Sequence, residues 1–151
     1  MFRGSSLQDI NLSSNKFTTI LPLLWAIQSG HIPIADLNIS NNRLGNKSLN
    51  QISDVLAHEP IISEEEWAKT KHKKVVKKLG SRYDCWLRSL TARWIGANVD
   101  SLIIFLFSAA NNLTLQYVNL SFNDFRGYKG DSIKFYTLNN NKVKNLNMSH
   151  C

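Results

Sequence analysis

The sequence has little cysteine and no long hydrophobic run. Its 151 residues include two cysteines, Cys85 and Cys151, which are far apart and belong to no CxxC pair. They indicate a reduced intracellular chain without a disulfide framework. The most apolar run, Leu102–Ala110, falls far short of the roughly 20 residues that a membrane span needs. Since the start of the chain also lacks an apolar segment of signal-peptide length, we expect a cytoplasmic location.

Residue groups that carry catalysis are missing as well. The sequence contains no Gly-rich phosphate loop and no Ser/His/Asp or Cys/His set at a suggestive spacing. The histidines are scattered: His31, His58, His72 and His150. Cys85 is a nucleophile or a small buried hydrophobic residue, and the second is the simpler interpretation. We therefore expect no enzymatic activity, no cofactor and no metal site.

The composition is that of a globular protein with a basic surplus. Apolar residues make up 43% of the chain and charged residues 19%, which is typical of a folded domain. A length of 151 residues is sufficient for one domain with a hydrophobic core. The net charge of +7 permits contact with nucleic acid, anionic lipid or an acidic protein, and it identifies none of them.

A short phrase recurs along the chain. The pattern aliphatic–Asn–aliphatic–Ser occurs at Ile10–Ser13, Leu37–Ser40, Val118–Ser121 and Leu146–Ser149. The starts of successive copies differ by 27, 81 and 28 positions, and the gap of 81 has room for two further units. The flanking residues extend it to a longer phrase at Leu7–Phe17, Ile34–Leu44, Leu115–Phe125 and Val143–Cys151. Internal repetition of this length is typical of a solenoid.

The phrase resembles the leucine-rich repeat, whose pattern is LxxLxLxxN/CxL. The period and the tail Ser48–Leu56 are similar to the ribonuclease-inhibitor-like subclass, in which each unit is a strand followed by a helix. The resemblance implies an α/β solenoid with a short-stranded parallel sheet on the concave side and helices on the convex side. Intracellular arrays of this kind occur in innate sensors, enzyme regulators and bacterial effectors. The Asn- and Lys-rich composition favours the effector type, which acts in the host cytosol.

The repeat divides one predicted domain into units of unequal regularity. We place them near 7–33, 34–60, 61–86, 87–114, 115–142 and 143–151. The third is an irregular basic helical unit, the fourth is degenerate and the last is partial. Aligning Leu102 with Leu49 places Leu90 under Leu37, and Ile95 then stands where the pattern has Asn.

The helical half of each unit is visible as apolar spacing. Two sets have the spacing of one buried helix face: Leu49, Ile52 and Leu56, then Leu102, Phe105, Leu106 and Ala109. Asn98 or Asp100 is the candidate cap of the second helix. The segment Gly130–Leu138 is a further candidate helix.

An Asn in the turn after each strand is part of the resemblance. The matching positions here are Asn15, Asn42, Asn123 and Cys151, where the pattern also allows Cys. A side-chain amide has two donors and an acceptor, so it can satisfy backbone groups that a buried turn would leave unpaired. The resemblance implies an asparagine ladder between neighbouring coils.

Residues between the core aliphatics are predicted to form columns on the concave face, where the family generally binds proteins. The candidate partner-binding residues are Asp9, Asn11, Ser13, Asp36, Asn38, Ser40, Tyr117, Asn119, Ser121, Phe122, Asn145 and Asn147. The repeated Asn and Ser are either recognition residues or relics of duplication. Asp36, Tyr117 and Phe122 vary between repeats and are the stronger candidates.

A lysine-rich helix is predicted over residues 64–79. Ser63 and Glu66 form a capping-box pattern, and Gly80 follows the last turn. Its lysines are Lys69, Lys71, Lys73, Lys74, Lys77 and Lys78. Three interpretations remain: a solvated outer helix, a contact with nucleic acid or anionic membrane, and an inserted partner-binding helix.

The sequence also raises the question of end caps. The first phrase begins at Leu7 and the last stops at the Asn/Cys position. Solenoids need capped ends, so we expect a piece of a longer protein, a truncated gene product, or self-association through the uncapped ends. The favoured function is protein–protein interaction through the concave face, and the alternative is basic-surface binding through residues 64–79.

Overall fold

The structure is a computed structural model that describes residues 7–28, 32–57, 87–110, 112–127 and 143–149. Short strands alternate with helices along these residues. The strands are β1 (Asp9–Asn11), β2 (Asp36–Asn38), β3 (Ser89–Thr91), β4 (Tyr117–Asn119) and β5 (Asn145–Asn147). The helices are α1 (Leu21–Gln28), α2 (Gly45–Leu56) and α5 (Val99–Ala110). The predicted helices over 64–79 and Gly130–Leu138 lie outside the described residues.

The strands form one parallel sheet in the order β1-β2-β3-β4-β5. Its register places the central aliphatic residues in one row: Ile10, Leu37, Leu90, Val118 and Leu146. The prediction of an α/β solenoid is confirmed, and Leu90 does pair with Leu37. Because β2 pairs directly with β3, one strand and not two lies between β2 and β4 in the sheet. We use "coil" for one strand with the turn and chain that follow it.

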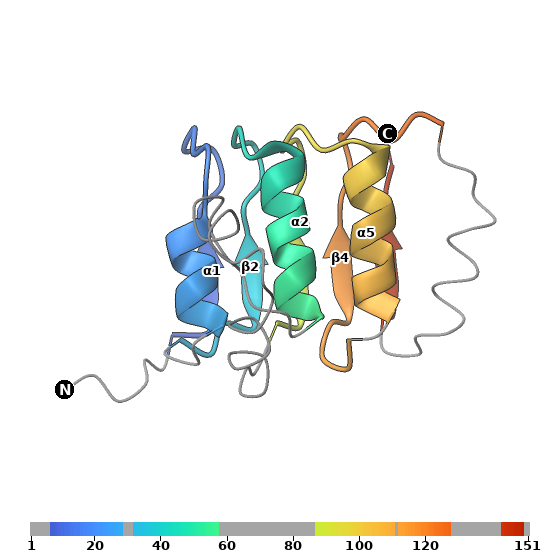
Figure 1. Cartoon of the computed structure of the whole chain (residues 1–151). Helices are drawn as coiled ribbons and strands as arrows, with labels where there is room; N and C mark the ends of the chain where they lie inside the picture. Colours follow the sequence, from blue (N-terminus) through green and yellow to red (C-terminus); the bar gives the residue numbers. More distant parts are fainter. Residues whose placement is uncertain (1–6, 29–31, 58–86, 111, 128–142, 150–151) are drawn as a thin grey trace, which may run out of the picture.

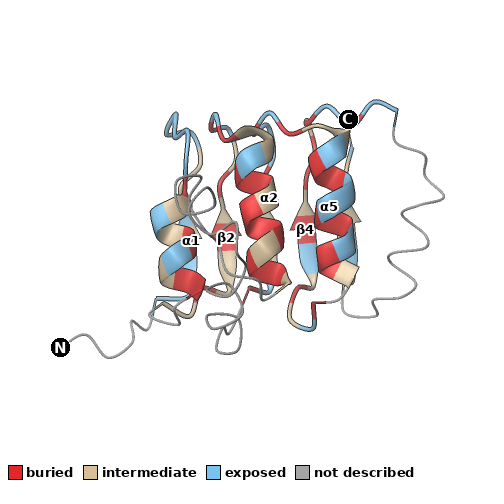
Figure 2. Cartoon of the chain, in the orientation of Figure 1, coloured by how far each residue is buried: buried red, intermediate tan, exposed pale blue. Residues whose placement is uncertain are grey.

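The helices form a second layer on one face of the sheet (Figure 1). Leu49, Ile52 and Leu56 of α2 are fully buried, because their spacing puts them on the side that faces the strands. Figure 2 shows the same inward buried stripe on α5, where Leu102 and Phe105 are inaccessible to solvent. No helix in the described part of the chain is long and apolar enough to cross a membrane.

Local sequence explains where α5 begins. Asn98 precedes its first residue, and the Asn98 side-chain oxygen accepts a hydrogen bond of 3.0 Å from the backbone N–H of Asp100. This bond satisfies one of the N–H groups that a helix start leaves unpaired. Of the two candidate caps, Asn98 is therefore the N-cap, and Asp100 lies in the first turn, where its charge suits the helix dipole.

Candidate functional site

The sheet face opposite the helices, which we call the concave face, carries columns of outward-pointing side chains. The first column is Asp9, Asp36, Ser89, Tyr117 and Asn145, and the second is Asn11, Asn38, Thr91, Asn119 and Asn147. The third, just after the strands, is Ser13, Ser40, Arg93, Ser121 and Ser149. All fifteen come from equivalent positions of adjacent coils, so side chains distant in sequence become neighbours.

The repeated asparagines of the second column are the last residues of their strands, and their side chains form the turns that follow. The side-chain oxygens of Asn11, Asn38, Asn119 and Asn147 each accept a hydrogen bond of 2.9–3.1 Å from the backbone N–H two residues later. Such a bond makes an Asx turn, which reverses the chain direction locally. The repeated Asn and Ser thus have a structural role in each turn.

Carboxylates gather at one end of the first column. Asp9 and Asp36 are paired positions of β1 and β2, and an Arg88 guanidinium nitrogen lies 3.2 Å from an Asp36 oxygen. The pKa of Asp9 is raised above its ordinary value, chiefly by a side-chain hydrogen bond with Asp36, then by desolvation and the Asp36 charge; Arg88 opposes the shift.

This shift predicts a pH-dependent effect of Asp9→Asn. A raised pKa means that the folded state holds the Asp9 proton more tightly than the unfolded chain does. Protonated Asp9 therefore stabilises the fold below pH 3.8, its ordinary pKa, and this stabilisation is lost as pH rises through the raised pKa. Asp9→Asn should therefore raise the melting temperature at pH 7 and leave it unchanged at pH 3. Thermal unfolding at both values tests this. Asp100→Asn on α5 is the control, and an equal gain there at pH 7 would contradict the explanation.

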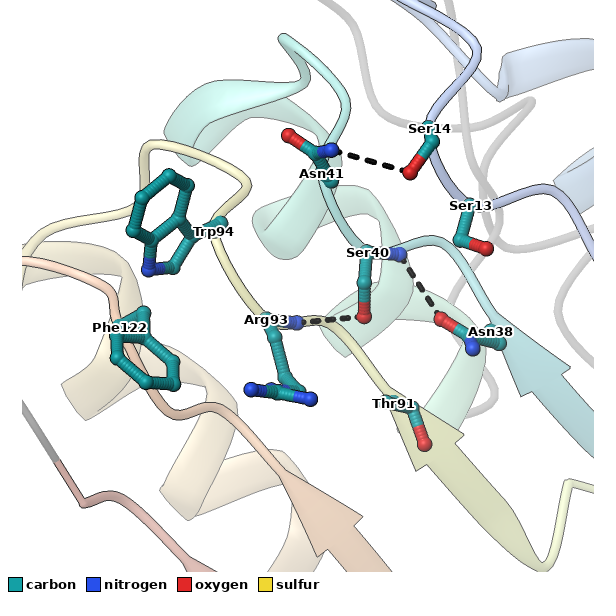
Figure 3. A pocket seen from close by; sticks show the side chains of 9 residues that line it. All are labelled: Ser13, Ser14, Asn38, Ser40, Asn41, Thr91, Arg93, Trp94 and Phe122. Atoms are coloured by element: carbon teal, nitrogen blue, oxygen red, sulfur yellow. Dashed lines mark hydrogen bonds between the residues drawn. The ribbon is translucent and has the colours of Figure 1, made fainter.

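A cluster of two aromatic rings and one arginine lies beside a hollow of about 390 Å³ at the turn end of the strands. The rings of Trp94 and Phe122 meet edge to face, with centroids 5.7 Å apart. The Arg93 guanidinium carbon lies 5.1 Å from the Phe122 ring centre. Figure 3 shows the three side chains on one side of the hollow and the serines of the first coil on the other. We call Arg93, Trp94 and Phe122 the aromatic cluster.

The two rings of the aromatic cluster, Trp94 and Phe122, occupy an unusual backbone position. Ser14, Asn41, Trp94 and Phe122 are equivalent in four coils, and all have left-handed φ angles between 54° and 63°. Asn tolerates this conformation because its side chain can bond locally, whereas a bulky side chain there costs roughly 1–2 kcal/mol. Two successive coils therefore hold large aromatic side chains where the backbone favours small polar ones. Strain of this kind clusters at functional sites.

Buried asparagines join neighbouring coils below the turns. The Asn42 side-chain oxygen accepts hydrogen bonds of 3.0 Å from the N–H groups of Asn15 and Phe17, and its nitrogen donates to the Leu12 carbonyl. Asn123 makes the equivalent bonds from the fourth coil to the third. Each side chain satisfies backbone groups of two coils at once.

Ile95 interrupts this ladder between the second and third coils. Its buried side chain offers no polar atom, so other groups join the coils there. Gly45 donates its N–H to the Ile95 carbonyl at 2.7 Å. The Asn46 side-chain oxygen accepts from Asn98 N–H at 2.8 Å and from the Ser101 hydroxyl at 2.7 Å. The degenerate unit is therefore joined to its neighbour differently from the regular units.

A family model described as Leucine Rich Repeat matches residues 6–26, which include β1, the first turn and part of α1. The other strands repeat the β1 geometry in register. The chain folds as a leucine-rich-repeat array. No curated protein matches the chain significantly by sequence.

A solved structure shares this leucine-rich-repeat fold. It is titled "Leiomodin-1 Actin-Binding Site 2 (ABS2)", and the similarity has a TM-score of 0.64 and covers 95% of this chain and 70% of that chain. The two sequences are 13% identical, so the likeness concerns the fold alone.

The array brings together every concave-face candidate, from Asp9 to Asn147, and adds residues that the repeat phrase did not contain. The additions are Arg88, Ser89, Thr91, Arg93 and Trp94, all in the degenerate coil. The alignment of Leu90 under Leu37 already placed Arg93 and Trp94 at the positions of Ser40 and Asn41. The positions of Arg93 and Trp94 on this face were therefore predictable from that alignment.

Several predicted site residues lie outside the described residues. They are Lys69, Lys71, Lys73, Lys74, Lys77, Lys78, Cys85 and Cys151. Within the described ranges, no group of three His, Cys, Asp or Glu side chains is arranged to hold a metal ion.

Proposed function

We propose that this chain is a non-enzymatic interaction module that binds a protein partner on the concave face of its leucine-rich-repeat array. One observation carries the proposal. Within the described residues, the three helices lie on one face of the parallel sheet (Figure 1), and no described helix covers the face that carries the columns. Parallel sheets are usually covered on both faces, so a face that no described helix covers is a candidate surface for a partner. Solenoids use such extended surfaces for binding.

The chemistry of the concave face supports a protein as partner. Tyr117 in β4 is 44% exposed, although an apolar ring favours burial. Tyrosine supplies a large contact area with a polar tip and is enriched at interface centres. The Asp36–Arg88 pair adds charges of both signs to the same column. Ser89 separates Asp36 from Tyr117 in that column. The leiomodin-1 structure's title names an actin-binding site, which supports protein binding as one use of this fold.

We also assign the array to the ribonuclease-inhibitor-like subclass. The starts of β3, β4 and β5 are spaced by 28 residues, in line with the period of that subclass. The helices α2 and α5 each have twelve residues, so the outer layer is helical instead of extended.

Partner capture from a cell lysate tests the binding face. We expect Tyr117→Ala to reduce recovery of a specific partner at least about tenfold, because hot-spot truncation costs about 2 kcal/mol or more. Asp36→Arg should act similarly by reversing a charge on the same face. The matched control is Ile104→Ala on α5, whose side chain is 46% exposed, and it should leave recovery unchanged. A partner lost equally with the control variant, or retained by all three, contradicts the proposal.

A further inference from the structure

We propose that the hollow beside the aromatic cluster receives a segment of the partner in which a carboxylate side chain adjoins an apolar one. This inference rests on the proposed function, because it names the chemistry that one part of the concave face selects. The hollow is lined by residues of four coils, from Ser13 to Phe122, and none of them is acidic. Its distinctive groups are Arg93, Trp94 and Phe122.

Arg93 is positioned to receive a carboxylate. Its Nε–H donates to the Ser121 hydroxyl at 3.1 Å, and its guanidinium carbon lies over the Phe122 ring. The salt bridges found among the described residues involve Arg88 and Arg126, and no described carboxylate lies within ion-pair distance of Arg93. A guanidinium is charged at any physiological pH and its N–H groups match both oxygens of a carboxylate. Charge complementarity thus favours an acidic group.

The two rings supply the apolar half of the site. Trp94 is 59% exposed, so its ring offers surface to a second side chain while it also packs against Phe122. Fold stability does not explain a tryptophan here, since the left-handed backbone favours Asn, as in the equivalent Asn41. Trp and Arg are enriched at the centres of protein interfaces. An aliphatic or aromatic side chain next to the carboxylate would cover the Trp94 ring.

A nucleic-acid strand is a poorer fit to the same groups. An aromatic ring and an arginine can hold a base, but strand binding draws its affinity from several cations along the phosphate backbone. Of the side chains that line the hollow, Arg93 alone is cationic, and the others are small hydroxyls, amides and the two rings. The observations therefore favour a peptide segment.

Titration of the full chain with short capped peptides, followed by NMR, tests the inference. The probes are acetyl-Gly-Glu-Phe-Gly-amide and its two relatives with Gln for Glu or Ala for Phe. The signals are the indole N–H of Trp94, assigned by its loss in Trp94→Asn, and the Nε–H of Arg93. We expect the Glu-Phe peptide to bind roughly tenfold more tightly than either relative, because each lacks one of the two contacts.

Variants separate the two contacts. Arg93→Gln should abolish the preference for Glu over Gln, and Trp94→Asn should abolish the preference for Phe over Ala while keeping the fold, since Asn suits the backbone there. The control is Arg126→Gln, whose native side chain pairs with Asp124 and does not line the hollow; both preferences should persist.

Three results overturn the inference: no shift at millimolar peptide, equal affinity for the Glu and Gln peptides, or tighter binding of oligothymidylate than of any peptide. Its failure is distinguishable from failure of the proposed function. If Arg93→Gln and Trp94→Asn still capture the partner that Tyr117→Ala loses, the concave face binds protein but this hollow does not. If all three variants capture it, both proposals fall.

Discussion

Asn123→Ala should lower the free energy of unfolding by about 3–5 kcal/mol, because it leaves buried backbone groups of two coils without partners. The Asn123 side chain is 3% exposed. Its oxygen accepts from the N–H groups of Ile95 and Ala97 at 3.1 and 3.2 Å. Its nitrogen donates to the carbonyls of Ala92 and Leu120, both at 2.9 Å. Urea unfolding of the wild type and the variant measures the difference.

Asn15→Ala is the matched control, because it removes the same residue type from the same position of the first coil. The Asn15 side chain is exposed and donates to the carbonyls of Leu12 and Ser13, which water can reach. We expect a loss below about 1 kcal/mol, the net value of an ordinary hydrogen bond. Equal losses for the two variants would contradict a ladder that joins coils and would indicate a local turn effect instead.

Phe105→Ala should also be severely destabilising, by about 3–5 kcal/mol, since it removes a large buried ring and leaves a cavity. Phe105 is completely inaccessible to solvent on the inner face of α5, where α5 packs against α2. For a chain of this length such a loss lowers the melting temperature by roughly 10 °C. Calorimetry or thermal unfolding measures the shift.

The neighbouring helix position provides the control for this second prediction. Phe107 lies two residues further along α5 and is 60% exposed. Because more than half of its surface stays in water on folding, Phe107→Ala should cost far less than Phe105→Ala, about 1 kcal/mol. Comparable losses at both positions would mean that the inner face of α5 does not close the core.

The two predictions concern different elements of the same architecture. Asn123 joins coils by hydrogen bonds at the turn, and Phe105 joins the helical layer to the strands by apolar burial. Neither residue belongs to the concave face, so their variants should affect partner binding only through loss of folded protein. Variants of Tyr117 and the aromatic cluster should show the opposite pattern, with stability kept and binding lost.

Much of the fold was predictable because its signals are local. In a strand, successive side chains point to opposite faces, so the phrase that places Leu37 and Ile39 in the core also places Asp36 and Asn38 outside it. The spacing of Leu49, Ile52 and Leu56 likewise predicts the buried face of α2. A repeat multiplies such signals, and the register of five strands follows from superposing the phrases.

The functional candidates were less predictable, because a method that depends on repeated local patterns detects the residues that depart from the pattern poorly. Tyr117 and Asp36 were identified because they vary within regular phrases. Arg93 and Trp94 belong to a coil whose phrase has Ala92 and Ile95 at two of its defining positions, so pattern matching gives this coil little weight. The repeated Asn and Ser carried the strongest pattern, yet their bonds show that they shape the turns.

The sequence by itself determined the alternation of strand and helix, the side chains that face the core and the positions of the ladder, since each depends on residues close together in the chain. The tertiary structure decided which coils are neighbours. Arg93 lies beside Ser40, 53 positions earlier, and beside Ser121 of the next coil, and the hollow with its aromatic rim exists only through that stacking. No local sequence pattern specifies that the coil of Ser40 pairs with the coil of Arg93. Their contact forms only when β2 and β3 pair in the sheet.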